Sequence, residues 1–129
     1  AAATFGRIEA EELIKLAEIA EKYNGGEIIF APFRRIILPN ISADNATNVL
    51  QSLAEAGFIT KAGDSRLSIH VCVGAPACSS AFGETRPLAR KWAEDHPNLT
   101  QIVHITGCSK GCAYSGKADI TIDLSINSF

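Results

Sequence analysis

Two short stretches contain all four cysteines of this 129-residue chain: CVGAPAC at residues 72–78 and CSKGC at residues 108–112. The first pair begins at the end of an alternating apolar run over residues 67–73, and the second follows an apolar run over residues 102–106; both runs predict β-strands. In strand-helix-strand folds, ligands collect beyond the carboxyl ends of the strands. We therefore expect the two cysteine pairs to share one site between two loops.

The number, pairing and placement of the cysteines favour a cubane iron–sulfur cluster, which takes four thiolate ligands. Three alternatives stay open. Structural zinc sites usually place paired ligands roughly two to four residues apart, a tighter spacing than that between Cys72 and Cys78. Disulfides are typical of small secreted domains, and buried free cysteines are the simplest reading.

Glycines accompany the cysteines. Gly74 lies inside the first pair, and Gly107 and Gly111 each precede a cysteine of the second pair. Because glycine has no Cβ, these positions are expected to let the backbone approach a bulky inorganic centre. Ordinary turns are the alternative explanation.

The composition indicates a folded protein without a strongly charged surface. Hydrophobic residues make up 47% of the chain, and the formal net charge is −2. This near balance argues against nucleic acid as a partner. No apolar run approaches the roughly 20 residues that cross a bilayer, and the first residues lack the features of a signal peptide. We therefore expect a cytoplasmic protein with no membrane partner.

The chain is expected to form two lobes, residues 1–62 and 63–129, because the polar residues 61–65 include a glycine and separate two patterned regions. An amphipathic helix is predicted over residues 9–23, and its apolar face is assigned to Leu13, Ile14, Ala17 and Ala20.

Two strands follow in the first lobe, at residues 28–30 and 36–38. A second helix is expected to start at Ser42 or Asp44 and to end at Gly57, before a closing strand over residues 58–60. This α-β-β-α-β order is the ferredoxin-like split motif without its first strand, which residues 4–6 are too short to supply.

The second lobe is expected to contain a helix over residues 85–95 and a last strand over residues 118–124, besides the two strands that precede the cysteines. The predicted fold is of the α+β class: a ferredoxin-like half-repeat packed on an α/β lobe that binds an iron–sulfur cluster.

Residues 72–78 and 104–113 resemble the nitrite and sulfite reductase superfamily, in which a [4Fe-4S] cluster is coupled to a tetrapyrrole. The siroheme reductases of that superfamily typically carry proline and asparagine after the third cysteine. Here Ser109-Lys110-Gly111 follows it and is similar to the precorrin-3B synthase family. Residues 31–34, Ala-Pro-Phe-Arg, are similar to a Thr-Pro-Trp-Arg element of the same family, with Ala31 and Phe33 as departures.

The resemblance implies oxygen-dependent hydroxylation and lactone formation on precorrin-3A during cobalamin synthesis. It implies a [4Fe-4S] cluster and a separate non-haem iron, for which no ligands can be assigned. The cluster ligands would be Cys72, Cys78, Cys108 and Cys112. Siroheme is expected only under the alternative of a sulfite or nitrite reductase.

The substrate of such an enzyme is an anionic tetrapyrrole with many carboxylates. Arg34, Arg35 and Lys110 are the candidate anchors for them. An electron donor is a further expected partner. Because the family is built as a pseudo-twofold repeat, the chain resembles a carboxyl-terminal portion that needs an amino-terminal half or a partner subunit. A non-catalytic electron-transfer module remains a further alternative.

Overall fold

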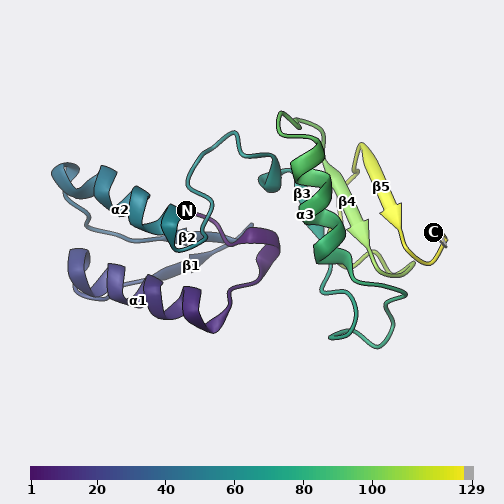
Figure 1. Ribbon diagram of the computed structural model, residues 1–129, viewed down its shortest axis with the longest axis horizontal. Coiled ribbons are helices and arrows are strands. Elements are labelled where there is room, and N and C mark those ends of the chain that lie inside the picture. The colour runs from purple at the N-terminus through teal and green to yellow at the C-terminus, as the bar shows by residue number, and fades with distance from the viewer. Residues whose placement is uncertain (127–129) are drawn as a thin grey trace. The chain divides into compact units, whose positions relative to one another are not determined.

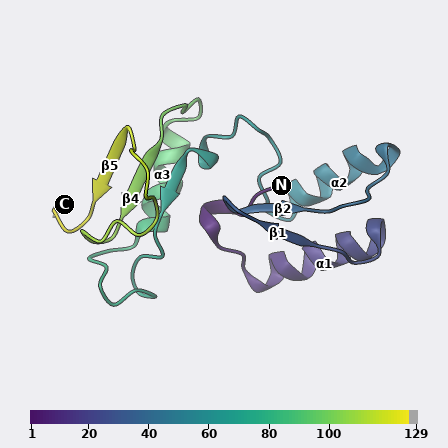
Figure 2. The same cartoon turned by 180° about the vertical axis from the view of Figure 1, so that it is seen from behind.

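The computed structural model describes residues 1–126 and divides the chain into two compact units, Ala1–Ala62 and a second unit that begins at Gly63. Figure 1 and Figure 2 show the elements of both units from opposite sides. Residues 127–129 of the predicted second lobe lie outside the described residues.

The first unit contains a β-hairpin with an additional strand position beside it. Strands β1 (Ile29–Ala31) and β2 (Arg35–Ile37) pair antiparallel. On the other side of β2, the backbone of Ala2 forms antiparallel bridges to both Arg35 and Ile59. Both hydrogen bonds between Ala2 and Ile59 measure 2.9 Å.

The expectation that the first strand is missing is therefore wrong. Residues 1–3 lie extended between β2 and Ile59 and complete the strand positions of the ferredoxin-like motif. The predicted closing strand over residues 58–60 is reduced to the single bridge at Ile59. The segment was too short to show the two-residue periodicity by which strands are predicted, so only the tertiary pairing reveals it.

Two helices form the core of the first unit with this sheet. Helix α1 spans Ala10–Asn24 and helix α2 spans Ala43–Glu55. The residues of the core cluster come from α1, α2 and the extended segments: Ala3, Leu16, Ile19, Ile36, Val49, Leu53, Ala56 and Phe58.

The predicted inner face of α1 needs a correction. Of the predicted residues, Ala20 is fully buried, but Leu13 and Ile14 are 46% and 59% exposed. Leu16 and Ile19, which were not predicted, are buried in the core. Several apolar residues occur around this helix, so sequence periodicity alone allowed two neighbouring faces. The packing against α2 and β2 selects the face that contains Leu16.

The second unit is a three-stranded parallel sheet with one crossover helix. Strands β3 (Ile69–Val71), β4 (Val103–Thr106) and β5 (Ile120–Asp123) lie in the order β3-β4-β5. Helix α3 spans Thr85–Asp95, as the sequence predicted, and connects β3 to β4. Together the two units confirm the predicted α+β class.

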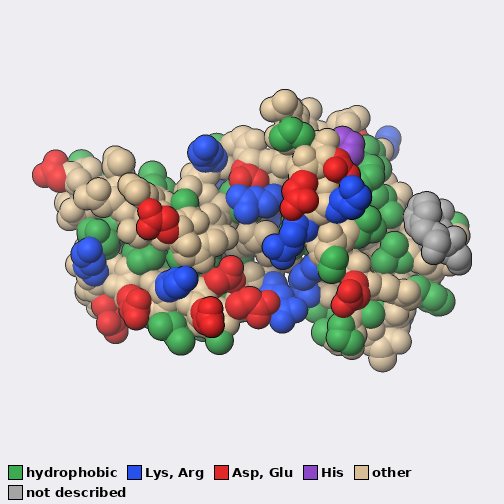
Figure 3. Space-filling view, in the orientation of Figure 1, with side chains coloured by type: hydrophobic (Ala, Val, Ile, Leu, Met, Phe, Trp, Pro, Cys, Tyr) green, Lys and Arg blue, Asp and Glu red, His purple; other side chains and the backbone are tan. Residues whose placement is uncertain are grey.

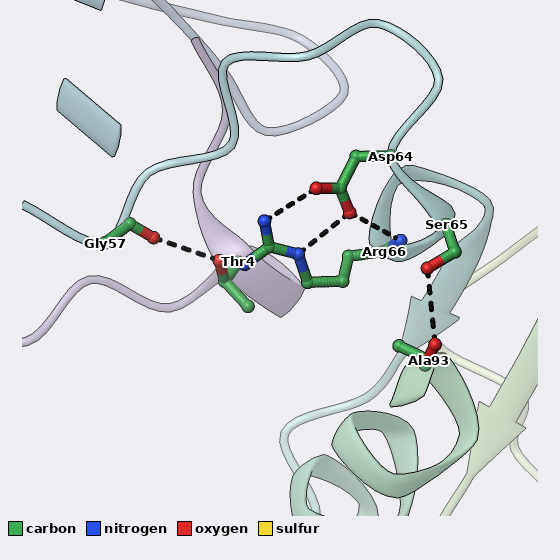
Figure 4. A network of polar contacts seen from close by, with 6 residues as sticks. All are labelled: Thr4, Gly57, Asp64, Ser65, Arg66 and Ala93. Atoms are coloured by element: carbon green, nitrogen blue, oxygen red, sulfur yellow. Dashed lines mark hydrogen bonds and ion pairs between the residues drawn. The ribbon is translucent and has the colours of Figure 1, made fainter. Parts of the chain in front are cut away.

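The first residues of the second unit form hydrogen bonds with one another and with the last turns of α3. Asp64 accepts hydrogen bonds from the backbone N–H and the guanidinium of Arg66, and Ser65 Oγ donates to the carbonyl of Ala93 in α3 at 3.5 Å. Figure 4 shows these contacts together with the hydrogen bond from Thr4 to Gly57 in the first unit. Among the described residues, no helix has both the length and the apolar character needed to span a bilayer.

Candidate iron–sulfur site

The two cysteine pairs follow neighbouring parallel strands. Cys72 comes directly after β3, and its N–H donates to the carbonyl of Ile105 in β4 at 3.2 Å. Cys108 lies two residues beyond the end of β4. Because β3 and β4 run parallel, their carboxyl ends meet at one edge of the sheet. The first cysteine loop (residues 72–84) and the second cysteine loop (residues 107–113) therefore leave the sheet side by side.

All four cysteines line one cavity of about 290 Å³, called the cysteine cavity below. Its other lining residues are Val73, Ala81, Thr106, Lys110 and Ala113. Cys108 is buried, Cys72 and Cys78 are half-buried, and Cys112 is exposed. The tertiary fold thus brings together residues that are up to 40 positions apart, from Cys72 to Cys112.

The four cysteines can be compared with the ligand requirements of a zinc ion and of an iron–sulfur cluster. In the part of the chain that the structure describes, no group of three or more His, Cys, Asp or Glu side chains could hold a metal ion. A structural zinc site needs four ligands within bonding distance of one ion. A cubane takes one thiolate for each of its irons, so its ligands surround a larger centre. Four cysteines around an apolar cavity fit that demand.

Two glycines allow the cysteine loops to pack closely. A Cβ at Gly107 would lie 2.7 Å from the Cβ of Ala81 in the other loop. Gly74 has a φ of +68°, and a Cβ there would collide with Thr85 at the start of α3. The close neighbours of these two glycines are protein atoms, whereas the sequence had suggested an inorganic centre. The glycines set how closely the loops approach each other and the helix.

A backbone hydrogen bond connects the second loop to a cysteine of the first. The N–H of Gly107 donates to Sγ of Cys72 over 3.2 Å. The hydroxyl of Thr85 donates to the carbonyl of Cys72 at 2.7 Å and so holds the same residue from the helix side. The two contacts hold Cys72 from the second loop and from α3.

Two cations are held at the cysteine loops. Lys110 Nζ donates to Ser80 Oγ at 3.0 Å and thereby connects the second loop to the first. Arg86, in the first turn of α3, donates from its guanidinium to the carbonyl of Val73 at 2.8 Å. Sequence reasoning singled out Lys110 and missed Arg86. Its position just after the predicted helix start was the available signal, but the contact depends on how the first loop folds back.

The other two predicted anchors belong to the first unit. Arg34 has a φ of +64° in the β1–β2 turn, and its carbonyl accepts a hydrogen bond from Ala3. Burial, and secondarily the charge of Arg35, lower the pKa of Arg34 below its ordinary value. Arg35 is exposed on β2. Of the three predicted anchors, Lys110 is the one that lines the cysteine cavity.

Charged side chains of both signs are interspersed on the face shown in Figure 3. Lys91 pairs with Asp95 at 2.8 Å on α3, and Arg7 pairs with Glu9 at 2.6 Å before α1.

Comparisons with known proteins show what the chain is similar to. Residues 1–56 match the nitrite/sulfite reductase ferredoxin-like half domain. The predicted resemblance to the nitrite and sulfite reductase superfamily is therefore confirmed, and the residues that match the family model lie within the first unit.

Individual relatives extend the similarity over most of the chain. It is 31% identical to a precorrin-3B synthase from Sinorhizobium sp over 122 residues, which cover 92% of this chain and 26% of that protein. It is 29% identical to the chloroplastic ferredoxin–nitrite reductase of Spinacia oleracea, with 89% of this chain and 20% of that protein covered.

A solved structure shows the same fold. The NirA protein of Mycobacterium tuberculosis superposes with a TM-score of 0.80 over 92% of this chain and 23% of its own, at 23% identity. The chain therefore spans about a quarter or less of the length of these relatives.

Proposed function

We propose that the second unit holds a [4Fe-4S] cluster and that the chain is part of an iron–sulfur tetrapyrrole oxidoreductase. The observation that carries this proposal is the convergence of Cys72, Cys78, Cys108 and Cys112 on one cavity. When bound, such a cluster supplies one-electron transfer.

The surrounding residues suit the binding of a cluster. The N–H of Gly107 donates to the Cys72 sulfur, as donors commonly do to cluster ligands, and Val73, Ala81 and Ala113 contribute apolar wall to the cavity. Lys110 places a positive charge at the same wall. These features favour retention of a thiolate-bound anionic centre.

For the reaction, we propose the precorrin-3B synthase type, oxygen-dependent hydroxylation and lactone formation on precorrin-3A. The similarity to the Sinorhizobium protein and the Ser109-Lys110-Gly111 sequence support it. Lys110 uses one ammonium proton for Ser80 and keeps two donors for a substrate carboxylate. Arg34 and Arg35 are proposed as further anchors. The rest of a longer protein or a partner subunit, an electron donor and a non-haem iron would complete the enzyme.

A siroheme-dependent nitrite or sulfite reductase is the second candidate. The similarity to the spinach nitrite reductase, at 29% identity, supports it. A sulfite reductase of Mycolicibacterium paratuberculosis, 26% identical over 125 residues, supports it as well. Both candidates share the cluster and differ in the tetrapyrrole that the complete protein binds.

The cluster is tested by anaerobic reconstitution of the 129-residue chain with iron and sulfide. We expect iron and acid-labile sulfide in the cubane ratio and an electron paramagnetic resonance signal after reduction. Cys108→Ser should lose most of the iron, whereas Ser109→Ala, its neighbour in the same loop, should retain it. Stoichiometric zinc in place of iron, or equal iron in both variants, would contradict the proposal. Anaerobic handling is essential because exposed thiolates oxidise in air.

The reaction type is tested after the chain is combined with the remaining portion of the enzyme. Binding of precorrin-3A without siroheme, followed by oxygen-dependent conversion to the hydroxylated lactone, is the expected result. A siroheme absorption spectrum would instead identify the reductase. A reducible cluster that binds neither tetrapyrrole would identify an electron-transfer module.

A further inference from the structure

The sheet of the second unit has a polar and aromatic face opposite α3. Ile69, Val103 and Ile105 are fully buried and alternate with His70 and His104 along β3 and β4. Because successive side chains of a strand point to opposite faces, the two histidines share the face that α3 does not cover. They are also directly opposite each other in the parallel register.

Tyr114 covers this face from the segment that connects β4 to β5. Its ring lies 4.2 Å from the ring of His70, centroid to centroid, with 33° between the planes. It also meets His104 edge-on at 6.3 Å. His104 is only 7% exposed. These distances lie in the range of favourable aromatic pairs.

The chain around Tyr114 is shaped to accommodate this contact. A Cβ at Gly116 would lie 2.8 Å from both Cζ and the hydroxyl oxygen of Tyr114, so a larger residue there would displace the ring. A Cβ at Gly111 would lie 3.5 Å from Cε1 of His104, which places the second cysteine loop directly against that imidazole.

Tyr114 and its stacking partner His70 both lie close to cysteines in the sequence. Tyr114 lies two residues after Cys112, and its stacking partner His70 lies two residues before Cys72. The ring pair therefore joins the chain just beyond the fourth cysteine to the strand that leads into the first. Cys112 is the exposed member of the four, at the outer end of its loop.

We propose that Tyr114 is a positioning residue, whose ring on His70 sets the separation between Cys72 and Cys112. The role in cluster binding rests on the proposed function, but the separation of the two thiols is a property of the metal-free chain. The stacking reduces the freedom of the second cysteine loop before any cluster binds. The loops are also joined by the N–H of Gly107 on Sγ of Cys72, by the N–H of Phe82 on the carbonyl of Gly107, and by the exposed contact from Lys110 to Ser80. In the second loop, all three contacts lie before Cys112.

Four variants test this role. Tyr114→Phe keeps a ring that can stack, and Tyr114→Ala removes it. Gly116→Ala keeps the tyrosine but displaces its ring. Phe82→Ala is the matched control, because Phe82 is a 73% exposed aromatic residue of the first cysteine loop that does not line the cysteine cavity.

Two measurements use the reduced, metal-free chain. We expect amide hydrogens of residues 109–117 to exchange about two- to tenfold faster in Tyr114→Ala and Gly116→Ala. This ratio of exchange rates corresponds to the free energy of one aromatic pair. In the same variants, the yield of a Cys72–Cys112 cross-link with dibromobimane should fall. Tyr114→Phe and Phe82→Ala should behave as wild type. Unchanged exchange and cross-linking in Tyr114→Ala would overturn the proposal.

The reconstituted chain provides the third measurement. The electron paramagnetic resonance line shape of the reduced cluster should change in Tyr114→Ala and be restored in Tyr114→Phe. Faster exchange in Tyr114→Ala with an unchanged line shape would overturn the positioning role. The Tyr114 ring would then order the loop without affecting the cluster. If wild type takes up no cluster, the proposed function fails, and the metal-free measurements alone decide whether Tyr114 sets the thiol separation.

Discussion

The N–H of Gly107 and Sγ of Cys72 form a 3.2 Å hydrogen bond between the two cysteine loops. The bond exists because Gly107 lies close to Ala81, so the second loop passes near the first cysteine. Close loop packing and the backbone donor to the Cys72 sulfur therefore both depend on the same glycine.

Substitution of this glycine should disturb both properties. In Gly107→Ala, the added Cβ would lie 2.7 Å from Ala81, and we expect the second unit to lose about 1–3 kcal/mol of unfolding free energy. Iron retention after reconstitution should fall as well. Gly63→Ala is the control, because a Cβ at Gly63 has no neighbour within 4 Å. Denaturant unfolding and iron analysis measure the two effects, and equal results for both variants would contradict this account.

Reversal of charge at Lys110 should lower the reduction potential of the bound cluster. An ammonium beside an anionic centre favours its more reduced form, and Lys110→Glu replaces that attraction by repulsion. We expect a shift on the order of tens of millivolts, because the side chain is exposed and its field is screened. Redox titration measures the shift. Lys117→Glu makes the same charge change at a residue that does not line the cysteine cavity, and an equal shift there would remove the specific role of Lys110.

The second unit should lose stability in mild acid through His104. Burial lowers the pKa of this imidazole, and the nearby carboxylate of Asp123 opposes the shift. The unfolded chain therefore binds a proton more readily than the folded one. Stability is complete above the ordinary histidine pKa of about 6.5 and falls as the pH decreases through the lower folded value.

Denaturant midpoints followed by the emission wavelength of Trp92, the single tryptophan of the chain, measure this dependence in the second unit. In His104→Phe the decrease between about pH 6.5 and pH 5 should become smaller. His96→Gln, which changes the exposed histidine stacked on Trp92 at 4.5 Å, should retain it. The same acid dependence in both variants would exclude His104 as its cause.

The two faces of α1 should respond differently to truncation. Leu16 is fully buried, and Leu16→Ala should lower the unfolding free energy of the first unit by about 2–5 kcal/mol. Ile14 is 59% exposed on the same helix, and Ile14→Ala should change the unfolding free energy by less than about 0.5 kcal/mol. Far-ultraviolet circular dichroism during denaturation distinguishes them. A larger loss of unfolding free energy in Ile14→Ala than in Leu16→Ala would support the inner face of α1 that the sequence predicted.

Much of the fold was predictable from local patterns. The helix over residues 85–95 was predicted with its observed bounds, because its apolar spacing, its early proline and the Pro97 break are all local signals. The burial of Leu16 and Ile19 on α1 and the strand position of residues 1–3 were not predicted. Both depend on neighbours that are distant in the sequence, namely α2 and β2 for the helix and Ile59 for the strand.

The candidate site, too, was predictable from the sequence only in part. The sequence by itself determined that the four cysteines come in two pairs after strands, because alternating apolar residues mark β3 and β4 locally. Only the tertiary structure decided that the pairs line one cavity, that Arg86 and Lys110 are held at its loops, and that Tyr114 covers the histidine face. The physical reason is that these contacts depend on the parallel register of β3 and β4, which joins residues more than 30 positions apart.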